Sequence, residues 1–204
     1  MPTLTALRPL ARWPVVAIVL LLAFVIQVAT RALNRRPFPP DTAPDGAYAR
    51  IALAVAERRP RDSFAYLETE AQWASYTVRD ARKKGCERVR KSYPADERKK
   101  LLEAWKDDCD AVDGSEVYER IALRRGWIAR LERDLSGVAR VEIQGERATV
   151  VTGRGTRYPF RRRDNGIWGL TIFTAELQAE AERASRDLEM VERAALDYER
   201  ATTR

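Results

Sequence analysis

The sequence predicts an α+β protein that is held in a membrane by one N-terminal helix. Three observations support this prediction. An uncharged apolar run covers residues 13–30, helical apolar spacing follows over residues 47–135, and the spacing changes to strict alternation over residues 141–172. We therefore expect helices packed on a curved four-stranded antiparallel meander, in a cone-like arrangement, followed by a long C-terminal helix.

The apolar run over residues 13–30 is predicted to be a transmembrane anchor behind a short tail, residues 1–12. At about 1.5 Å per residue it spans about 27 Å, slightly less than a hydrocarbon core of about 30 Å. The flanking Arg12 and Arg31 can reach the headgroups and make up the difference. A cleaved signal peptide and a buried soluble helix are the alternatives, and the first is disfavoured because no small-residue cleavage site follows. We expect a single-pass signal anchor that contacts the lipid bilayer.

The formal charge of +7 invites a nucleic-acid interpretation, so its location matters. Residues 1–36 contain five arginines and no acid, whereas the rest of the chain carries 32 basic and 30 acidic residues. Most of the excess charge therefore flanks the predicted anchor, where it suits anionic headgroups. We expect no nucleic-acid partner.

Cys86 and Cys109 are the two cysteines, and the absence of histidine excludes a Cys/His metal site. In a straight helical hairpin turning at residues 93–94, Cys86 would lie about 11 Å before the turn and Cys109 about 23 Å after it. Bonded cysteines need Cα atoms within about 7 Å. A disulfide therefore requires the chain to fold back near residues 107–113, and two free thiols are the alternative.

The side of the membrane is predicted mainly from this cysteine pair. Arginines are nearly balanced on the two sides of the anchor, so the positive-inside rule does not decide. A pair of cysteines in a small charged domain favours an oxidising compartment. The use of arginine for 31 of the 37 basic residues is typical of a GC-rich bacterial coding sequence. We expect a bacterial inner-membrane protein with a periplasmic domain.

The chain after the anchor divides into a Pro-rich linker over residues 31–43, an α+β domain over 44–173 and the C-terminal helix. The prolines of the linker and Pro44 directly after it favour extended backbone rather than helix. A first helix is predicted from Ala47 to Pro60. A second is predicted over residues 62–85 from apolar residues at alternating steps of three and four, with Gly85 as its natural terminator.

Residues 86–110 are strongly charged and are predicted to form a helical excursion with a turn at Tyr93-Pro94. Ser115 is a good N-cap for a third long helix. Gly126 interrupts the middle of that helix and Gly137 ends it.

Four short alternating segments predict the strands of the meander. Turns at Gly145, at residues 153–155 and at residues 164–166 separate them, and Asn165-Gly166 is the strongest hairpin signal. The alternating apolar residues are Val141 and Ile143, Ala148 and Val150, Tyr158 and Phe160, and Trp168, Leu170 and Ile172.

The last helix is predicted over residues 174–204, with Thr174 as its N-cap and Glu176 in the first turn. Its apolar residues follow four-three spacing, which makes a narrow seam. They are Leu177, Ala181, Ala184, Leu188, Val191, Ala195 and Tyr198. The seam either docks on the domain of the same chain or joins two copies in a homodimer.

Helices followed by strands over residues 147–151 and 157–170, with a charged turn before Gly166, Ile167 and Trp168, resemble the nuclear transport factor two-like (SnoaL-like) superfamily. The resemblance covers about residues 44–173. It implies a cone between sheet and helices that can hold a small ligand. Enzymes of this superfamily, which resemble ketosteroid isomerase or polyketide cyclases, place acid/base residues there. The excursion over residues 86–110 departs from the family pattern, and no catalytic residue is carried over.

The candidate site is an arginine cluster at two hairpin ends, where guanidinium groups can bind carboxylates or phosphates. A solvated strand edge is the alternative explanation. Two aromatic residues at inward-facing positions, expected mainly in the core, are added as candidate ligand contacts. The candidate residues are Arg154, Arg157, Arg161, Arg162, Arg163, Tyr158 and Trp168.

The sequence thus favours a membrane-anchored binding or assembly module over an enzyme, and no cofactor or metal is expected. An acidic ligand or a protein is the expected partner. The first alternative is an enzyme that uses the cone with an Asp or Tyr, and it requires a pocket carboxylate whose pKa is displaced. The other is a scaffold that dimerises through residues 174–204.

Overall fold

The computed structural model describes residues 21, 27, 38–134 and 136–202. The chain divides into two compact units, Met1–Phe38 and Pro39–Arg204. The predicted anchor therefore lies outside the described residues except for two positions. Among the residues that are described, no helix combines the length and the apolar character needed to cross a membrane.

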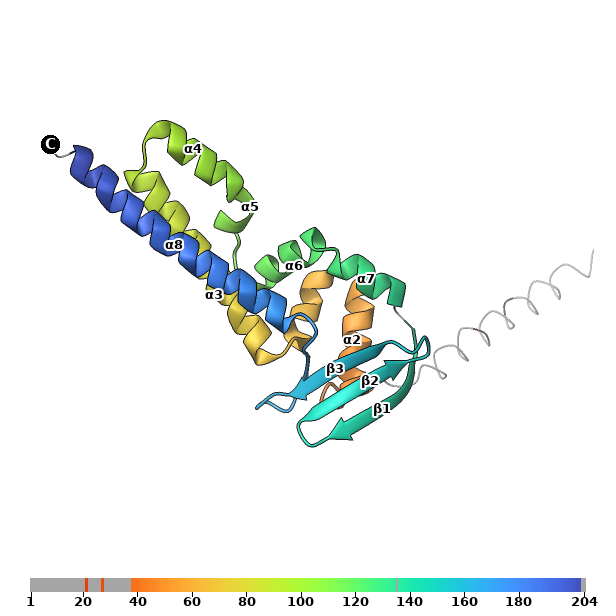
Figure 1. Ribbon diagram of the computed structural model, residues 1–204. Helices are drawn as coiled ribbons and strands as arrows, with labels where there is room; N and C mark the ends of the chain where they lie inside the picture. Colours follow the sequence, from red (N-terminus) through yellow and green to blue (C-terminus); the bar gives the residue numbers. More distant parts are fainter. Residues whose placement is uncertain (1–20, 22–26, 28–37, 135, 203–204) are drawn as a thin grey trace, which may run out of the picture. The chain divides into compact units, whose positions relative to one another are not determined.

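The second unit is an α+β domain, as predicted, with a four-stranded antiparallel sheet and a long C-terminal helix (Figure 1). Figure 1 shows the sheet at one end of this unit and two long helices, α3 and α8, extending side by side away from it. The elements are, in chain order, α2 (Pro44–Ala56), η1 (Pro60–Tyr66), α3 (Thr69–Ser92), α4 (Ala95–Ala104), α5 (Lys106–Cys109), α6 (Gly114–Arg124), α7 (Trp127–Asp134), β1 (Val138–Gln144), β2 (Arg147–Thr152), β3 (Arg157–Arg162), β4 (Trp168–Leu170) and α8 (Thr174–Thr202).

The first helix begins earlier than expected. Pro44, assigned to the extended linker by its sequence, occupies the start of α2. Proline fits there because the first helical residue needs no donor and takes the fixed φ of proline. The predicted second helix is also divided, since residues 60–66 form the 3₁₀ helix η1 and α3 begins only at Thr69.

Gly85 does not end the second helix, which was a wrong prediction. The α3 helix continues through it to Ser92 and stops before Tyr93-Pro94. A Cβ atom at Gly85 would lie 3.2 Å from the ring of Trp105, which is tighter than ordinary packing. The glycine therefore lets Trp105 approach α3, and tertiary contact explains it better than helix termination does.

The third helix is interrupted at Gly126, as predicted, and forms α6 and α7. Gly126 has a φ of +69°, a left-handed conformation that glycine adopts without strain. The N-cap differs from the prediction: Asp113, not Ser115, caps α6, and its carboxylate accepts a hydrogen bond from the Glu116 amide at 3.0 Å. Ser115 instead donates its hydroxyl to Asp113 at 2.6 Å.

The strands follow the order β1-β2-β3-β4 with antiparallel pairing throughout. Their buried side chains face α2 and η1 and fill the space between the sheet and the helices. Tyr48 of α2 packs on Tyr158 with ring centroids 5.3 Å apart, and Trp127 stacks on Phe173 at 4.4 Å. The largest fully buried side chains include Tyr118, Phe160, Phe173, Leu67, Ile121, Leu170 and Leu177.

The C-terminal helix α8 packs along α3 of the same chain. The seam residues Leu177, Ala184 and Val191 are buried by this contact. Beyond the main core, a second buried cluster of Val89, Tyr93, Val191 and Ala195 joins the distal parts of the two helices. The seam is thus covered within one chain.

Ion pairs reinforce the pairing of α3 with α8. Arg88 donates to both carboxylate oxygens of Glu199, at 2.8 and 3.0 Å. Arg82 pairs with Asp187 at 2.7 Å, and its guanidinium lies 4.5 Å from the ring centroid of Trp105.

Cys86 and Cys109 form a disulfide, with Cα atoms 6.0 Å apart. The chain turns at Trp105 between α4 and α5, so α5 returns to α3 rather than continuing along a straight hairpin. This return brings together two cysteines that a straight hairpin would keep apart.

Candidate functional site

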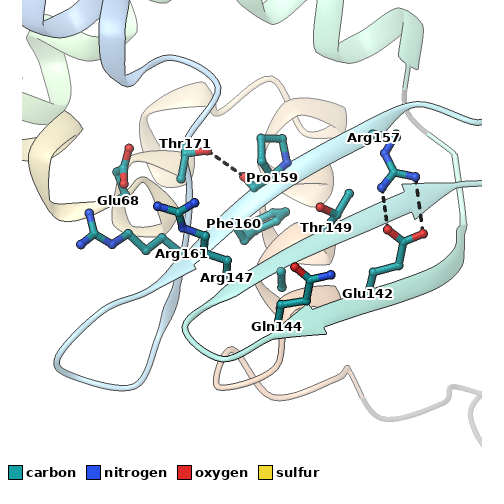
Figure 2. Close-up of a pocket in the computed structure, with 11 residues that line it drawn as sticks. Glu68, Glu142, Gln144, Arg147, Thr149, Arg157, Pro159, Phe160, Arg161 and Thr171 are labelled. Carbon is teal, nitrogen blue, oxygen red and sulfur yellow. Dashed lines mark hydrogen bonds and ion pairs between the residues drawn. The ribbon is translucent and has the colours of Figure 1, made fainter.

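A groove of about 490 Å³ lies on the face of the sheet that is turned away from α2, which we call the outer face. Figure 2 shows that the groove crosses β1, β2 and β3 and ends beside the start of α3. We call it the sheet groove. It is lined by Glu68, Glu142, Gln144, Arg147, Ala148, Thr149, Arg157, Pro159, Phe160, Arg161 and Thr171.

Strand register explains how these side chains come to share one face. Arg147 of β2 lies directly opposite Arg161 of β3, and Gln144 of β1 lies opposite Arg147 on the other side. The next row contains Thr149 and Pro159. Because side chains alternate between faces along a strand, these rows all project to the outer face.

Arg147 and Arg161 form a like-charge cross-strand pair, which is destabilising in the absence of a counterion. Arg161 is partly compensated, since it donates to Glu70 of α3 at 2.9 Å. Arg147 is exposed, and no carboxylate within residues 38–134 or 136–202 forms an ion pair with it. Figure 2 shows both arginines at the same end of the groove.

At the other end of the groove, the arginines share a carboxylate. Arg157 donates to both oxygens of Glu142, at 2.5 and 3.4 Å, and Arg140 donates to the same carboxylate at 2.9 Å. These hydrogen bonds, led by that from Arg157, lower the pKa of Glu142. Arg157 is therefore already paired, whereas Arg147 has no carboxylate partner among the described residues.

Glu68 lies at the margin of the groove near Arg161 and is only 6 % exposed. Burial raises the pKa of its carboxyl group, although the Thr174 hydroxyl donates to it. Its amide donates to the carbonyl of Leu170 at 3.2 Å, which closes the β4 edge of the sheet. Gly169 permits this approach, because a Cβ atom there would lie 2.5 Å from the Glu68 Cα.

The predicted arginine cluster is divided among three places. Arg157 and Arg161 line the sheet groove. Arg162 and Arg163 lie around a second hollow of about 430 Å³ at the β3–β4 hairpin end, where Arg162 is 4.0 Å from Glu146. Arg154 lies in the β2–β3 turn.

Two of the predicted arginines, Arg163 and Arg154, donate hydrogen bonds to backbone carbonyl groups. Arg163 donates to the carbonyl of Ala65 at 2.8 Å and to the side chain of Gln72 at 3.3 Å. Arg154 donates to the carbonyl of Arg133. These contacts tie hairpin ends to neighbouring helices.

Tyr158 and Trp168 are both 4 % exposed and lie on the inner face. Desolvation raises the pKa of Tyr158 to about 12. Trp168 donates its indole N–H to the carbonyl of Thr42 at 3.1 Å. The structure therefore places both in the core, away from the arginines of the groove.

Arg147, Glu142 and Glu68 were missed by the sequence prediction. Strand alternation places Arg147 on the face opposite Ala148 and Val150, so its direction was readable from the sequence. Its position opposite Arg161 depends on the register of β2 and β3, which the lengths of the turns determine. No local signal marks the burial of Glu68.

Comparisons with protein-family models, with curated proteins and with solved structures found no match. The resemblance to the nuclear transport factor two-like superfamily therefore stays a prediction. Among the described residues, no group of three or more His, Cys, Asp or Glu side chains is placed to hold a metal ion.

Proposed function

We propose that this chain is a membrane-anchored binding module, without catalysis of its own, whose sheet groove receives an acidic segment of a protein partner. The apolar run over residues 13–30 supports the anchor, and the basic residues that flank it suit a bilayer. A bacterial inner membrane with a periplasmic domain is the location that the arginine usage and the cysteine pair favour.

One observation supports an acidic ligand: Arg147 and Arg161 lie directly opposite each other in an open groove. A carboxylate placed between them would accept hydrogen bonds from both guanidinium groups and relieve their repulsion. Each such charge-assisted bond contributes about 1.5–3 kcal/mol.

The lining of the groove favours an extended acidic segment over a compact small molecule. Pockets for small molecules are predominantly apolar. Here charged and polar side chains, such as Gln144 and Thr149, cover most of the floor. A ligand running from Arg147 toward Arg157 would meet positive charge first and then the Glu142 carboxylate.

The test is binding of a short peptide that alternates glutamate with serine, compared with its glutamine counterpart, to the full-length chain in detergent micelles. Arg147→Gln should weaken binding of the glutamate peptide about tenfold or more. Arg154→Gln is the matched control, since it removes the same charge from the β2–β3 turn outside the groove. Its affinity should remain close to that of the unaltered chain.

Equal affinity for the glutamate and glutamine peptides would contradict the proposal. So would unchanged binding by Arg147→Gln. Binding of inorganic phosphate without binding of the glutamate peptide would point to another ligand class and would also overturn it.

Glu68 supports a second candidate, an enzyme that uses this groove for proton transfer. It is a carboxylate with a raised pKa at the groove margin, which is the feature that an enzymatic function requires. The Thr174 hydroxyl beside it gives an equally good structural reason for its position. If Glu68→Gln leaves peptide binding unchanged, the carboxylate is not needed for recognition. Loss of a reaction on the bound ligand in the same variant would favour the enzyme.

A further inference from the structure

The sheet has two edges, and only one of them is closed. At β4, the parallel bridge between Leu67 and Leu170 covers the edge. At the other edge, β1 pairs with β2, and no other strand of the described part of the chain lies beside it (Figure 1). β1 is seven residues long and contains neither proline nor lysine, which commonly protect edge strands, and its pairing with β2 is irregular between Val138 and Arg140.

The hairpin fixes which backbone groups of β1 point outward. Gln144 and Arg147 are opposite each other across a two-residue turn. In such a hairpin the closing pair is hydrogen-bonded, and the bonding alternates along the strand. The N–H and C=O groups of Val141 and Ile143 therefore point away from β2, toward the open edge, whereas the register shift between Val138 and Arg140 interrupts the alternation at Ala139.

The side chains of β1 select one partner and one register. In an antiparallel pair of identical strands centred on Val141, Arg140 lies opposite Glu142 of the second copy, and Glu142 lies opposite its Arg140. Centring the pair on residue 140 places arginine against arginine, and centring it on residue 142 places glutamate against glutamate. Opposite charges across strands are stabilising and like charges are not.

We infer that two copies of this chain associate through their β1 strands, antiparallel and with the two-fold axis at Val141, to form one continuous eight-stranded sheet. In this register the outward-pointing N–H and C=O groups of Val141 bond to those of Val141 in the second copy. Arg140 and Glu142 occupy non-hydrogen-bonded positions, where cross-strand side chains approach most closely.

The exposure of Ile143 also indicates that the β1 edge is a contact surface. Ile143 is 58 % exposed, although it lies on the inner face of the sheet with Val141, which packs against the core. In the proposed pair it lies opposite Ala139 of the second copy, which leaves room for the larger side chain. A large apolar residue at an unpaired strand edge is otherwise an aggregation hazard.

Pairing of two β1 strands does not depend on the ligand of the sheet groove. A two-fold axis perpendicular to the sheet keeps both outer faces on the same side, so a dimer would present two sheet grooves on one surface. The alternative is that Arg140 and Glu142, which already pair at 2.9 Å within one chain, only keep the edge soluble. In that case the protein is a monomer.

Disulfide crosslinking of the full-length chain in detergent micelles tests the register. Residue 141 would face itself across the axis with Cα atoms about 5.5 Å apart, which suits a disulfide. Val141→Cys should therefore form a covalent dimer under mild oxidation. Ile143→Cys, on the same face and the same strand, is the matched control and should not, because the two copies of residue 143 lie about 13 Å apart.

A mixture of Ala139→Cys and Ile143→Cys chains should crosslink to each other, because these positions are opposite in the proposed register. Crosslinking of Val141→Cys with Ile143→Cys instead would indicate a pair centred on residue 142 and would overturn the register. Equal crosslinking of every variant would indicate random collision and would overturn the interface.

Sedimentation of the full-length chain supplies a measurement without engineered cysteines, and a dimer is expected. Val141→Pro removes an outward N–H while leaving the bonds between β1 and β2, so the dissociation constant should rise about tenfold or more. If that variant loses its circular dichroism spectrum, Ile143→Lys replaces it and should have the same effect. A monomeric unaltered chain, or a dimer unaffected by both substitutions, would refute the inference.

Discussion

Replacing both bonded cysteines by alanine, Cys86→Ala with Cys109→Ala, should lower the free energy of unfolding by about 3 kcal/mol. The estimate follows from the separation of 23 residues between the cysteines. A crosslink over that length removes chain entropy from the unfolded state, and the benefit grows only slowly with loop length. Alanine is chosen rather than serine because both sites are buried, and a serine hydroxyl there would have no water to bond.

The loss should be concentrated in the segment that the disulfide holds. None of the ten residues of α4, all of which the structure describes, is buried. Its neighbour Trp105 contacts α3 at Gly85, and the disulfide joins α5 to the same helix. Without the disulfide, few buried apolar contacts keep α4 and α5 against α3, so their amide hydrogens should exchange faster than those of the sheet.

The assay is urea unfolding followed by circular dichroism, with the unaltered chain measured oxidised and reduced. Reduction should reproduce the effect of the double substitution, and a reductant should have no further effect on the alanine variant. If oxidised and reduced chains differ by less than about 1 kcal/mol, the loop-entropy reasoning is wrong. Amide exchange that accelerates equally in the sheet would contradict the expectation that the loss is concentrated in α4 and α5.

Three further predictions concern single side chains. Asp113→Ala removes the cap of α6 and should cost about 1–2 kcal/mol at neutral pH. Hydrogen bonds, led by that from Ser115, lower the pKa of Asp113 to about 2, so the cost seen in urea unfolding should disappear as the pH falls from 3.8 through 2. Gly169→Ala should prevent the close approach of Glu68 and lower the melting temperature by several degrees, whereas Gly153→Ala, with its nearest contact at 3.6 Å, should have little effect. Because burial raises the pKa of Glu68, its stabilising contribution is lost as pH rises through that pKa, so Glu68→Gln should unfold at higher urea than the unaltered chain at pH 7 and equally below pH 4.5. A Glu68→Gln chain that is less stable at pH 7 would contradict the assigned burial effect.

The elements that could be predicted are those determined by local chemistry. Alternation of apolar and polar residues predicted the strands, and glycines at Gly145 and Gly166 predicted the turns, where both have positive φ. Gly126 was recognised as an interruption for the same steric reason. The four-three spacing of the last helix predicted a buried face, though not what would cover it.

The candidate site was predicted only in part, because its members meet through register. Arg161 and Arg157 were selected as part of an arginine cluster, but that cluster also contained Arg154, which fixes a carbonyl on another element. Arg147 became a candidate only when pairing placed it opposite Arg161. Alternation indicates the face of a side chain, whereas pairing decides its neighbours.

The sequence by itself thus determined the α+β class, the meander and the length of the C-terminal helix, since backbone sterics and the burial period act within a few residues. The tertiary structure decided the rest. Gly85 lies inside α3, where its lack of a side chain lets Trp105, twenty positions later, approach the helix, and Cys86 meets Cys109 because the chain turns back after α4. The burial of Glu68 depends on Gly169 and Thr174, a hundred residues away. Such contacts between distant segments leave no periodic trace in the sequence, because each is determined by the shape of a surface that exists only after folding.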